Sequence, residues 1–211
     1  MYGRERIRKA KRVANPGCYA TSTQMLLAPL VSHMNSHAMP SVFGISGYSG
    51  AGTVASTNSE GEPISLPKVT PESLRGGVKP YSLTDHIHER EAGFHLSSLL
   101  STNAMGMKVA FVPSVGTWFS GILTTASVPL NGRFTARQIG ELFEKKYEGE
   151  RMVKFSKGVP ELRDVEGKHG WVCGGFQVHS DGERVVVVGG LDNLLKGAAT
   201  QCLQVRSFFC R

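Results

Sequence analysis

The sequence predicts an α+β fold with a mixed, largely antiparallel sheet. The expected strands come in neighbouring runs, and the expected helices are grouped between them rather than alternating with single strands. The last two strands are separated only by the turn sequence SDGE, which is typical of a hairpin. No G-x-G-x-x-G motif follows a strand near the start, so most of any dinucleotide-binding domain is expected to lie outside these 211 residues.

Hydrophobic periodicity places the elements along the chain. Apolar residues near a 3.6-residue period predict helices, and short apolar runs between turn residues predict strands. Residues 56–83 are dominated by Pro, Gly, Ser and Thr and are expected to form a long ordered loop. We expect strands at 11–17 (the end of a short strand), 41–52 (ending in a Gly/Ser-rich loop), 108–115, 121–130, 171–180 and 184–191. We expect helices at 19–34 despite Pro29, 88–101, 135–149 and 192–205, the last capped by Asp192 or Asn193.

The positive charge of the chain is concentrated at its start. The formal net charge is +7, and the first twelve residues carry six basic side chains against the single acidic Glu5. The remainder has mixed signs and no basic stripe interleaved with aromatic residues, so we expect no nucleic-acid partner. No stretch approaches about 20 consecutive apolar residues, so we also expect no membrane-spanning helix.

Cys18 is the first of four cysteines, none of which forms a C-x-x-C pair. Neither a disulfide framework nor a zinc cluster is indicated, and a reducing compartment fits best. Cys18 follows the sharp Pro16-Gly17 turn at a helix start, where free N–H groups and the helix dipole favour a thiolate and a lowered pKa. It is either a nucleophile or a buried, inert cysteine, and spacing alone does not decide between these.

A thiol nucleophile needs a partner for proton transfer, and the segment DHIHERE at 85–91 offers candidates. His86 and His88 would point the same way on an extended segment, which makes a metal site conceivable, although no third ligand stands at a recognisable spacing. A solvated charged turn is the second interpretation. The third is a Cys–His pair whose ring is oriented by neighbouring carboxylates, with Arg90 meeting an anion.

Four segments in order, NPGCYATS, SGYSGAG, DHIHERE and DNLLKGAATQ, resemble N-acetyl-γ-glutamyl-phosphate reductase from about Lys11 to Gln204. The likeness is closest to the fungal form, the reductase part of a mitochondrial arginine-biosynthesis polyprotein. The resemblance implies a semialdehyde-dehydrogenase dimerisation-like fold with helices on one face and the N-terminal Rossmann half missing. It divides the chain into a remnant of the nucleotide-binding domain at 1–14, a catalytic and dimerisation domain at 15–190, and a C-terminal helix at 191–211 that packs back toward the nucleotide-binding domain.

The resemblance also implies an activity, the NADPH-dependent reduction of N-acetylglutamyl 5-phosphate to the 5-semialdehyde with release of phosphate, by a homo-oligomer in the mitochondrial matrix. Cys18 would form a thioester, and His86 would handle protons. Arg90 and Glu91 are expected at the substrate, and no metal is expected. The NADP(H) cofactor would lie against the glycine-rich loop, and its expected contacts are Ser46, Gly47, Ser49, Gly50 and Asn193.

Departures from the family pattern leave an alternative open. The 211 residues do not include the Rossmann half expected of the family, and the ending QCLQVRSFFCR lacks the amphipathic Leu/Asn-rich segment typical of the family. Thr53 also stands where bacterial relatives typically have Arg. The alternative is a truncated, inactive fragment that acts as a dimerisation or interaction module. Aspartate-semialdehyde dehydrogenase shares the cysteine chemistry, but DHIHERE and DNLLKGAATQ argue against it.

Overall fold

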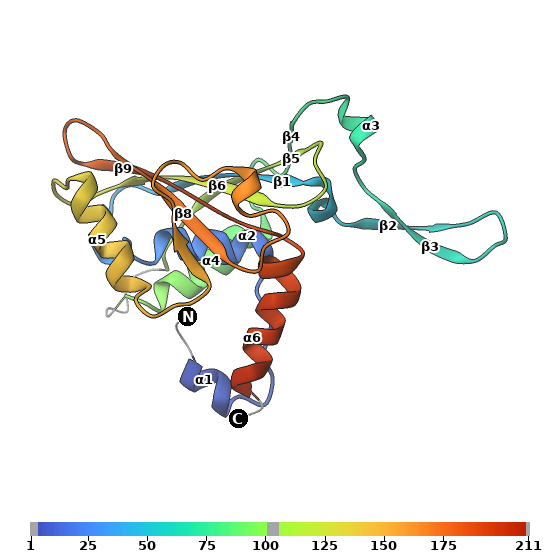
Figure 1. The fold of residues 1–211 in the computed structure, drawn as a ribbon, viewed down its shortest axis with the longest axis horizontal. Coiled ribbons are helices and arrows are strands. Elements are labelled where there is room, and N and C mark those ends of the chain that lie inside the picture. The colour runs from blue at the N-terminus through green and yellow to red at the C-terminus, as the bar shows by residue number, and fades with distance from the viewer. Residues whose placement is uncertain (1–3, 101–105, 210–211) are drawn as a thin grey trace.

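A seven-stranded mixed sheet forms the centre of the chain, described here by a computed structural model of residues 4–100 and 106–209 (Figure 1). Its strand order is β4-β5-β1-β6-β9-β8-β7. The β1–β5 and β7–β8 pairs are parallel and the other pairs antiparallel, which confirms the predicted fold class. The strands are β1 Ser41–Gly47, β4 Lys79–Pro80, β5 Ala110–Gly116, β6 Ile122–Pro129, β7 Val153–Phe155, β8 Trp171–Val178 and β9 Arg184–Leu191.

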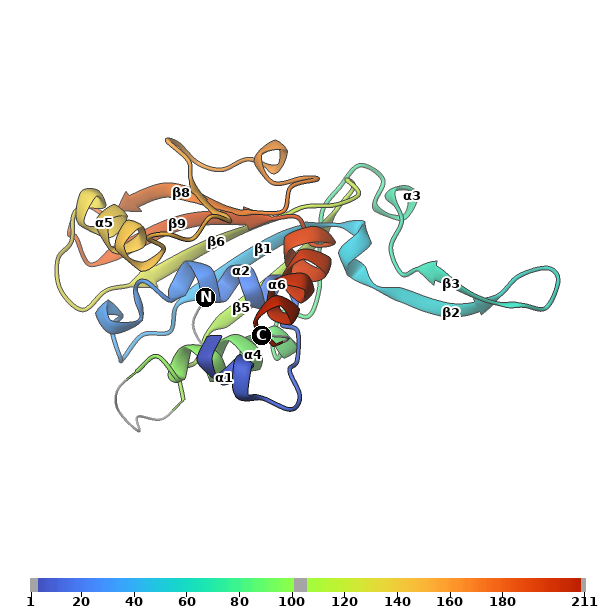
Figure 2. The same cartoon turned by 60° about the horizontal axis from the view of Figure 1, so that its bottom comes forward.

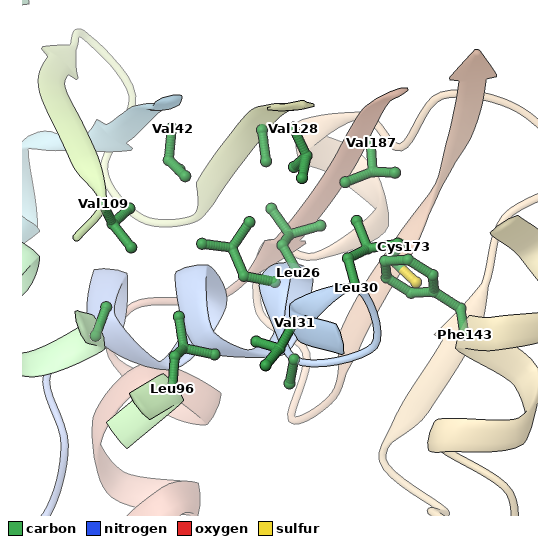
Figure 3. Packing of buried hydrophobic residues seen from close by; sticks show 14 of the residues in the cluster. Leu26, Leu30, Val31, Val42, Leu96, Val109, Val128, Phe143, Cys173 and Val187 are labelled. Carbon is green, nitrogen blue, oxygen red and sulfur yellow. The ribbon is translucent and has the colours of Figure 1, made fainter. Parts of the chain in front are cut away.

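Helices pack on one face of this sheet, as the resemblance implies. Figures 1 and 2 show α2, α4, α5 and α6 on the same side. Leu26 and Leu30 from the α2 region meet Val128 and Val187 of the sheet, and Phe143 of α5 reaches Cys173 (Figure 3). These helices are α2 Cys18–Leu27, α4 Ile87–Ser97, α5 Ala136–Lys146 and α6 Thr200–Phe209. None of the helices in the described part of the chain is long and apolar enough to span a membrane.

The opposite face of the sheet is covered only in part. Val165, in the loop after the short 3-10 helix η3 (Leu162–Asp164), packs beside Gly190 of β9. Farther along this face, Phe43 and Ile45 of β1 keep 52% and 37% of their surface exposed. Successive side chains of a strand point to opposite faces of the sheet. Val42 is fully buried on the helix side of β1, so Phe43 and Ile45 lie on the other side, and β1 carries apolar residues on both faces. An apolar strip therefore lies open on the face away from the helices.

The segment predicted as one long loop at 56–83 contains short strands and a helix, so the prediction of a single loop is wrong. Strands β2 (Thr53–Thr57) and β3 (Pro63–Pro67) form an antiparallel hairpin, followed by α3 (Pro71–Leu74) and β4. The hairpin projects from the body in both views (Figures 1 and 2). The composition of residues 56–83 favoured a loop, because Ser, Thr and Pro are typical of loops. This two-stranded hairpin contains few apolar residues, so the sequence shows little of the apolar pattern that predicts strands.

The first part of the chain also differs from the prediction. No strand forms at 11–17; instead α1 occupies Arg4–Lys9, and an irregular segment leads to Gly17. Helix α2 ends at Leu27, before Pro29, and a 3-10 turn, η1 (Val31–His33), replaces the rest of the helix predicted at 19–34. Proline has no N–H and clashes with the preceding turn, so an α-helix ends before it. The helix predicted at 88–101 ends at Ser97, and its final residue lies outside the described residues.

The C-terminal segment begins as a π-helix. η4 (Leu195–Ala199) follows β9 and continues into α6. The N-cap of η4 is Leu194, so neither Asp192 nor Asn193 occupies the predicted cap position, although Oδ1 of Asp192 accepts hydrogen bonds from the backbone N–H groups of Leu194 and Leu195. Helix α6 then runs away from the sheet, and α1 packs against it with the Arg4 guanidinium 5.1 Å from the Phe208 ring (Figure 1). The three-part division of the chain stays a prediction.

Candidate active site

Cys18 is the first residue of α2, at the turn that the sequence indicates. Gly17 is the N-cap in an extended conformation, and its carbonyl accepts the N–H of Thr21. Burial raises the pKa of the Cys18 thiol, the backbone amides of the helix start oppose this more weakly, and Glu91 adds to the rise. The predicted lowering of this pKa is therefore wrong for the chain as described, because burial outweighs the helix amides. Cys18 is a thiol at neutral pH.

The histidine motif lies at the start of α4, beside that turn. Asp85 has a left-handed backbone, with φ 58°, and turns the chain into the helix. His86 is the N-cap, and its Nδ1 accepts a hydrogen bond from the N–H of His88 at 3.3 Å. The two rings lie 4.8 Å apart although His88 is helical rather than extended, and both pack near Phe111. Within the described residues, no group of three His, Cys, Asp or Glu is arranged to hold a metal ion.

Glu91 and His88 contact the nucleophile turn directly. Glu91 Oε1 accepts the backbone N–H of Gly17 at 3.2 Å. His88 Nε2 lies close to Gly17: a Cβ added to Gly17 would be 2.2 Å from this nitrogen. The other ring nitrogen of His88, Nδ1, is buried without a hydrogen-bond partner among the described atoms. Burial, and then the neighbouring His86, lower the pKa of His88 to about 4. The 3.9 Å contact of His88 with Glu91 is therefore not an ion pair at neutral pH.

Burial also lowers the pKa of His86, against a smaller opposing effect of Glu89. Both rings are consequently neutral near pH 7. Since Nδ1 of His86 accepts a hydrogen bond, its proton sits on Nε2, which is the donor nitrogen in this tautomer. Neutral His88 keeps an unprotonated nitrogen that accepts a proton. The pair therefore offers one hydrogen-bond donor and one unprotonated nitrogen beside a neutral thiol.

Two tyrosines that the sequence analysis did not select complete this side of the site. The Tyr19 hydroxyl donates to the carbonyl of Ser114 at 2.9 Å. The pKa of Tyr81 is raised to about 12, first by burial and then by the charge that Cys18 carries as a thiolate. Tyr19 follows the nucleophile in NPGCYATS and could have been noticed there. Tyr81 has no such signal, because only the β4–β5 pairing brings it to the site.

The five residues expected at the cofactor lie together. Gly121 donates its N–H to Asn193 Oδ1 at 2.7 Å, and Asn193 Nδ2 donates to the Ser49 hydroxyl at 2.9 Å. A Cβ on Gly47 would lie 2.3 Å from the Phe119 carbonyl oxygen, so only glycine fits there. Ser46 is buried and Gly50 is exposed, and a Cβ on Gly50 would come within 3.4 Å of the side chains of both Ser46 and Asn193.

The π-helix holds the nucleophile turn from the other side. A Cβ on Gly197 would lie 2.5 Å from Cys18 Cβ, so the backbone of η4 and the nucleophile are in direct contact. Asn15 Nδ2 donates to the Ala198 carbonyl at 3.3 Å, which ties the segment before Cys18 to the same helix. Such π-helical turns are often found at functional sites. The small residues of KGAAT are the only sequence signal for this contact.

The Arg90 side chain lies outside the cluster of Cys18, Glu91 and His88. It is exposed on α4, while its neighbour Glu91 reaches Gly17. Two other basic residues near this segment are also exposed: Arg75 is the left-handed cap of α3, and Lys79 lies in β4. Substrate contacts of Arg90 and Glu91 stay predictions.

A cavity of about 460 Å³ lies on the far side of the Gly17–Glu91 contact. It is lined mainly by α1, α2, α4 and α6 and the segment before Cys18, with Pro16, Glu91, Phe94 and Gln201 among its walls. Cys18, His86 and His88 are not part of its lining.

The fold and site define a class of protein. Residues 18–193 match the family described as "Semialdehyde dehydrogenase, dimerisation domain". The chain belongs to this family. Aspartate semialdehyde dehydrogenase II from Vibrio cholerae shares the fold at a TM-score of 0.69, with 18% identity over 97% of this chain and 65% of that chain.

Relatives of higher identity confirm the resemblance. The chain is 47% identical over 201 residues to "Protein arg-6, mitochondrial" of Neurospora crassa, a match that covers 95% of this chain and 21% of that protein. It is 41% identical to N-acetyl-gamma-glutamyl-phosphate reductase of Stenotrophomonas maltophilia, over 95% of this chain and 57% of that protein. The chain thus spans about one fifth of the fungal relative and a little over half of the bacterial one.

Proposed function

We propose that this chain is the catalytic and dimerisation part of an N-acetyl-γ-glutamyl-phosphate reductase. The observation that carries the proposal is the contact of the Cys18 turn with Glu91 and His88, inside the segment that matches the dehydrogenase family. The substrate is N-acetylglutamyl 5-phosphate, an acyl phosphate, and the product is the 5-semialdehyde. The names of the fungal relatives support a mitochondrial location for the parent protein.

The first step is acyl transfer to Cys18. Because the thiol is neutral, its proton must leave as Sγ attacks the acyl carbon, and the unprotonated nitrogen of His88 accepts it. The carbon–oxygen bond to phosphate then breaks, and inorganic phosphate departs from a thioester on Cys18. His86, with its proton on Nε2, serves in the second half-reaction as the hydrogen-bond donor to the substrate oxygen, where negative charge develops, and the proton held by His88 returns to the Cys18 thiolate when the semialdehyde leaves. Glu91 keeps the Gly17 amide, and with it Cys18, in place.

The residues around Ser49 fit one end of a nicotinamide cofactor, for which we propose NADP(H). Gly47 leaves the loop no room for a side chain, and Ser49 and Gly50 present a small, polar edge at the end of β1. Such a surface lets a ring approach the backbone closely. When bound, the cofactor supplies the hydride that reduces the thioester. The described residues contain no glycine-rich phosphate loop between a strand and a helix, so they would hold only the nicotinamide end.

Acyl transfer is testable without the cofactor. The chain is incubated with N-acetylglutamyl phosphate, and peptide mass spectrometry locates any N-acetylglutamyl group while released phosphate is measured. We expect the group on Cys18, and no phosphate release above background in Cys18→Ser. Acylation should slow in His88→Gln and persist in His86→Gln. Modification spread over the cysteines, or release unchanged in Cys18→Ser, would contradict the proposal.

The alternative function, a dimerisation module without catalysis, has an observation in its favour. Phe43 and Ile45 leave an apolar strip open on the sheet, and such strips mark interaction surfaces. We propose that two copies pair through this face. The two functions are compatible, and sedimentation of the chain tests the pairing independently: a monomer at all concentrations would exclude it.

A further inference from the structure

The β2–β3 hairpin, called the arm below, has no core of its own. Its register places Val54 opposite Leu66 and Ser56 opposite Ile64, which puts three apolar side chains on one face of the arm. Val54 and Leu66 each keep 45% of their surface exposed. A two-stranded hairpin alone in water is marginally stable, so an arm of this kind gains stability from a surface that covers its apolar face.

The arm is nevertheless built to hold its shape. Asn58 Oδ1 accepts the backbone N–H groups of Glu60 and Glu62 at the tip, and Lys68 N–H donates to the Gly52 carbonyl at the base. Its only substantial packing on the rest of the described chain is with η2 (Tyr48–Ala51). No surface among the described residues covers the apolar face of the arm.

The arm is continuous with the face proposed to pair. Strand β1, which exposes Phe43 and Ile45, leads through η2 directly into β2. A second copy that covers the open strip would therefore reach the base of the arm, which projects from the body (Figure 2). The exposed side chains are apolar on both surfaces, which suits the same kind of partner.

We propose that the arm clasps a second copy of this chain, with Val54, Leu66 and Ile64 buried against it. The inference rests on the proposed pairing of the open sheet faces and adds a second, separate contact to it. The acidic tip, with Glu60 and Glu62, stays in water. The clasp makes each copy hold the other at two places, and two linked contacts bind more tightly than either alone.

Substitutions on the two faces of the arm test the clasp. In Val54→Thr/Leu66→Thr, the apolar face becomes polar while threonine keeps the preference for a strand. The matched control, Ala55→Thr/Ser65→Thr, alters the paired positions on the other face of the arm. We expect the first variant to raise the dimer dissociation constant at least tenfold in sedimentation velocity, and the control to leave it within twofold. At a protein concentration too low for the chain to dimerise, thermal unfolding of the body should not change, because no arm side chain belongs to the core.

The outcomes separate the clasp from the pairing it rests on. Phe43→Ser/Ile45→Ser should weaken the dimer whether or not the arm takes part. If these face substitutions weaken it and the arm substitutions do not, the clasp is wrong and the pairing stands. If the unsubstituted chain is monomeric, both fail. Amide exchange of residues 53–67 gives a direct reading: protection that increases with protein concentration supports the clasp, and protection independent of concentration contradicts it.

Discussion

Gly197→Ala tests whether the C-terminal π-helix fixes the nucleophile. The added Cβ would lie 2.5 Å from Cys18 Cβ, 3.2 Å from Cys18 Cα and 3.1 Å from Leu191 Cδ1. The first two atoms belong to the first turn of α2 and cannot rotate away, so the π-helix and α2 must separate. Overpacking of this kind costs about 1–3 kcal/mol. Alanine in place of a helical glycine recovers about 1 kcal/mol, so we expect a net loss of about 1 kcal/mol in the free energy of unfolding.

Gly140 provides the matched control. It also lies in a helix, α5, but a Cβ there would meet only Phe176 Cδ2 at 3.8 Å, an ordinary contact. Gly140→Ala should therefore stabilise the chain by about 0.5–1 kcal/mol. The two substitutions should move the midpoint of urea unfolding, followed by circular dichroism, in opposite directions with unchanged slopes. A second readout is the rate at which iodoacetamide alkylates Cys18, which should change only in Gly197→Ala.

If the two alanine variants behave alike, the π-helix does not fix the position of Cys18. Equal stabilisation would mean that η4 and α2 separate freely, so that Gly197 fixes nothing. A loss of stability with an unchanged alkylation rate would mean that the strain is absorbed at Leu191 rather than at the nucleophile.

Three further predictions follow from the same contacts. The alkylation rate of Cys18, measured against pH, should have its midpoint above pH 9, because the pKa of the thiol is raised from 9.0. A midpoint near pH 7 would instead support the activated thiolate predicted from the position of Cys18 in the sequence. The pKa of His88 is about 4 in the folded chain against 6.5 unfolded, so the unfolded state takes up its proton first and stability falls as the pH drops from 6.5 to 4. This loss is on the order of 3 kcal/mol and should be absent in His88→Gln, as urea unfolding at several pH values would show. Asn193→Ala leaves the buried Gly121 N–H without its acceptor and should lower the free energy of unfolding by about 2 kcal/mol in the same assay. The comparison variant Thr135→Ala removes the exposed capping box of α5 and should lower it by about 1 kcal/mol.

The sequence predicted the sheet well because its strands are apolar and bounded by turn residues. The β8–β9 hairpin and helix α5 lie close to their expected positions, since both carry strong local signals, SDGE in one case and a capping threonine with periodic apolar residues in the other. Helix α1, the arm and the short strands β4 and β7 were missed. Each depends on pairing or packing with distant residues, and short elements of this kind have little periodicity to detect.

The site was predicted in part. Cys18, the histidine pair and the glycine-loop cluster could be named from motifs, but the protonation state of the nucleophile could not. Burial decides that state, and burial depends on α4 and η4 packing around the turn. For the same reason the sequence favoured His86, whereas the described geometry also brings His88 to the turn.

The contact between η4 and the nucleophile turn has a consequence for the order of folding. Asn15 and Ala198, which tie the two segments together, are 183 residues apart in the chain. Closing so long a loop is entropically costly, and pairings of high sequence separation form late unless a folded core brings them together. The sheet and α2 can form without η4, but Cys18 acquires its final surroundings only when the last strand has paired and η4 has docked. During synthesis on the ribosome the cysteine therefore emerges well before the η4 segment that encloses it, so a chain not yet extended to η4 carries an unprotected thiol but no assembled site.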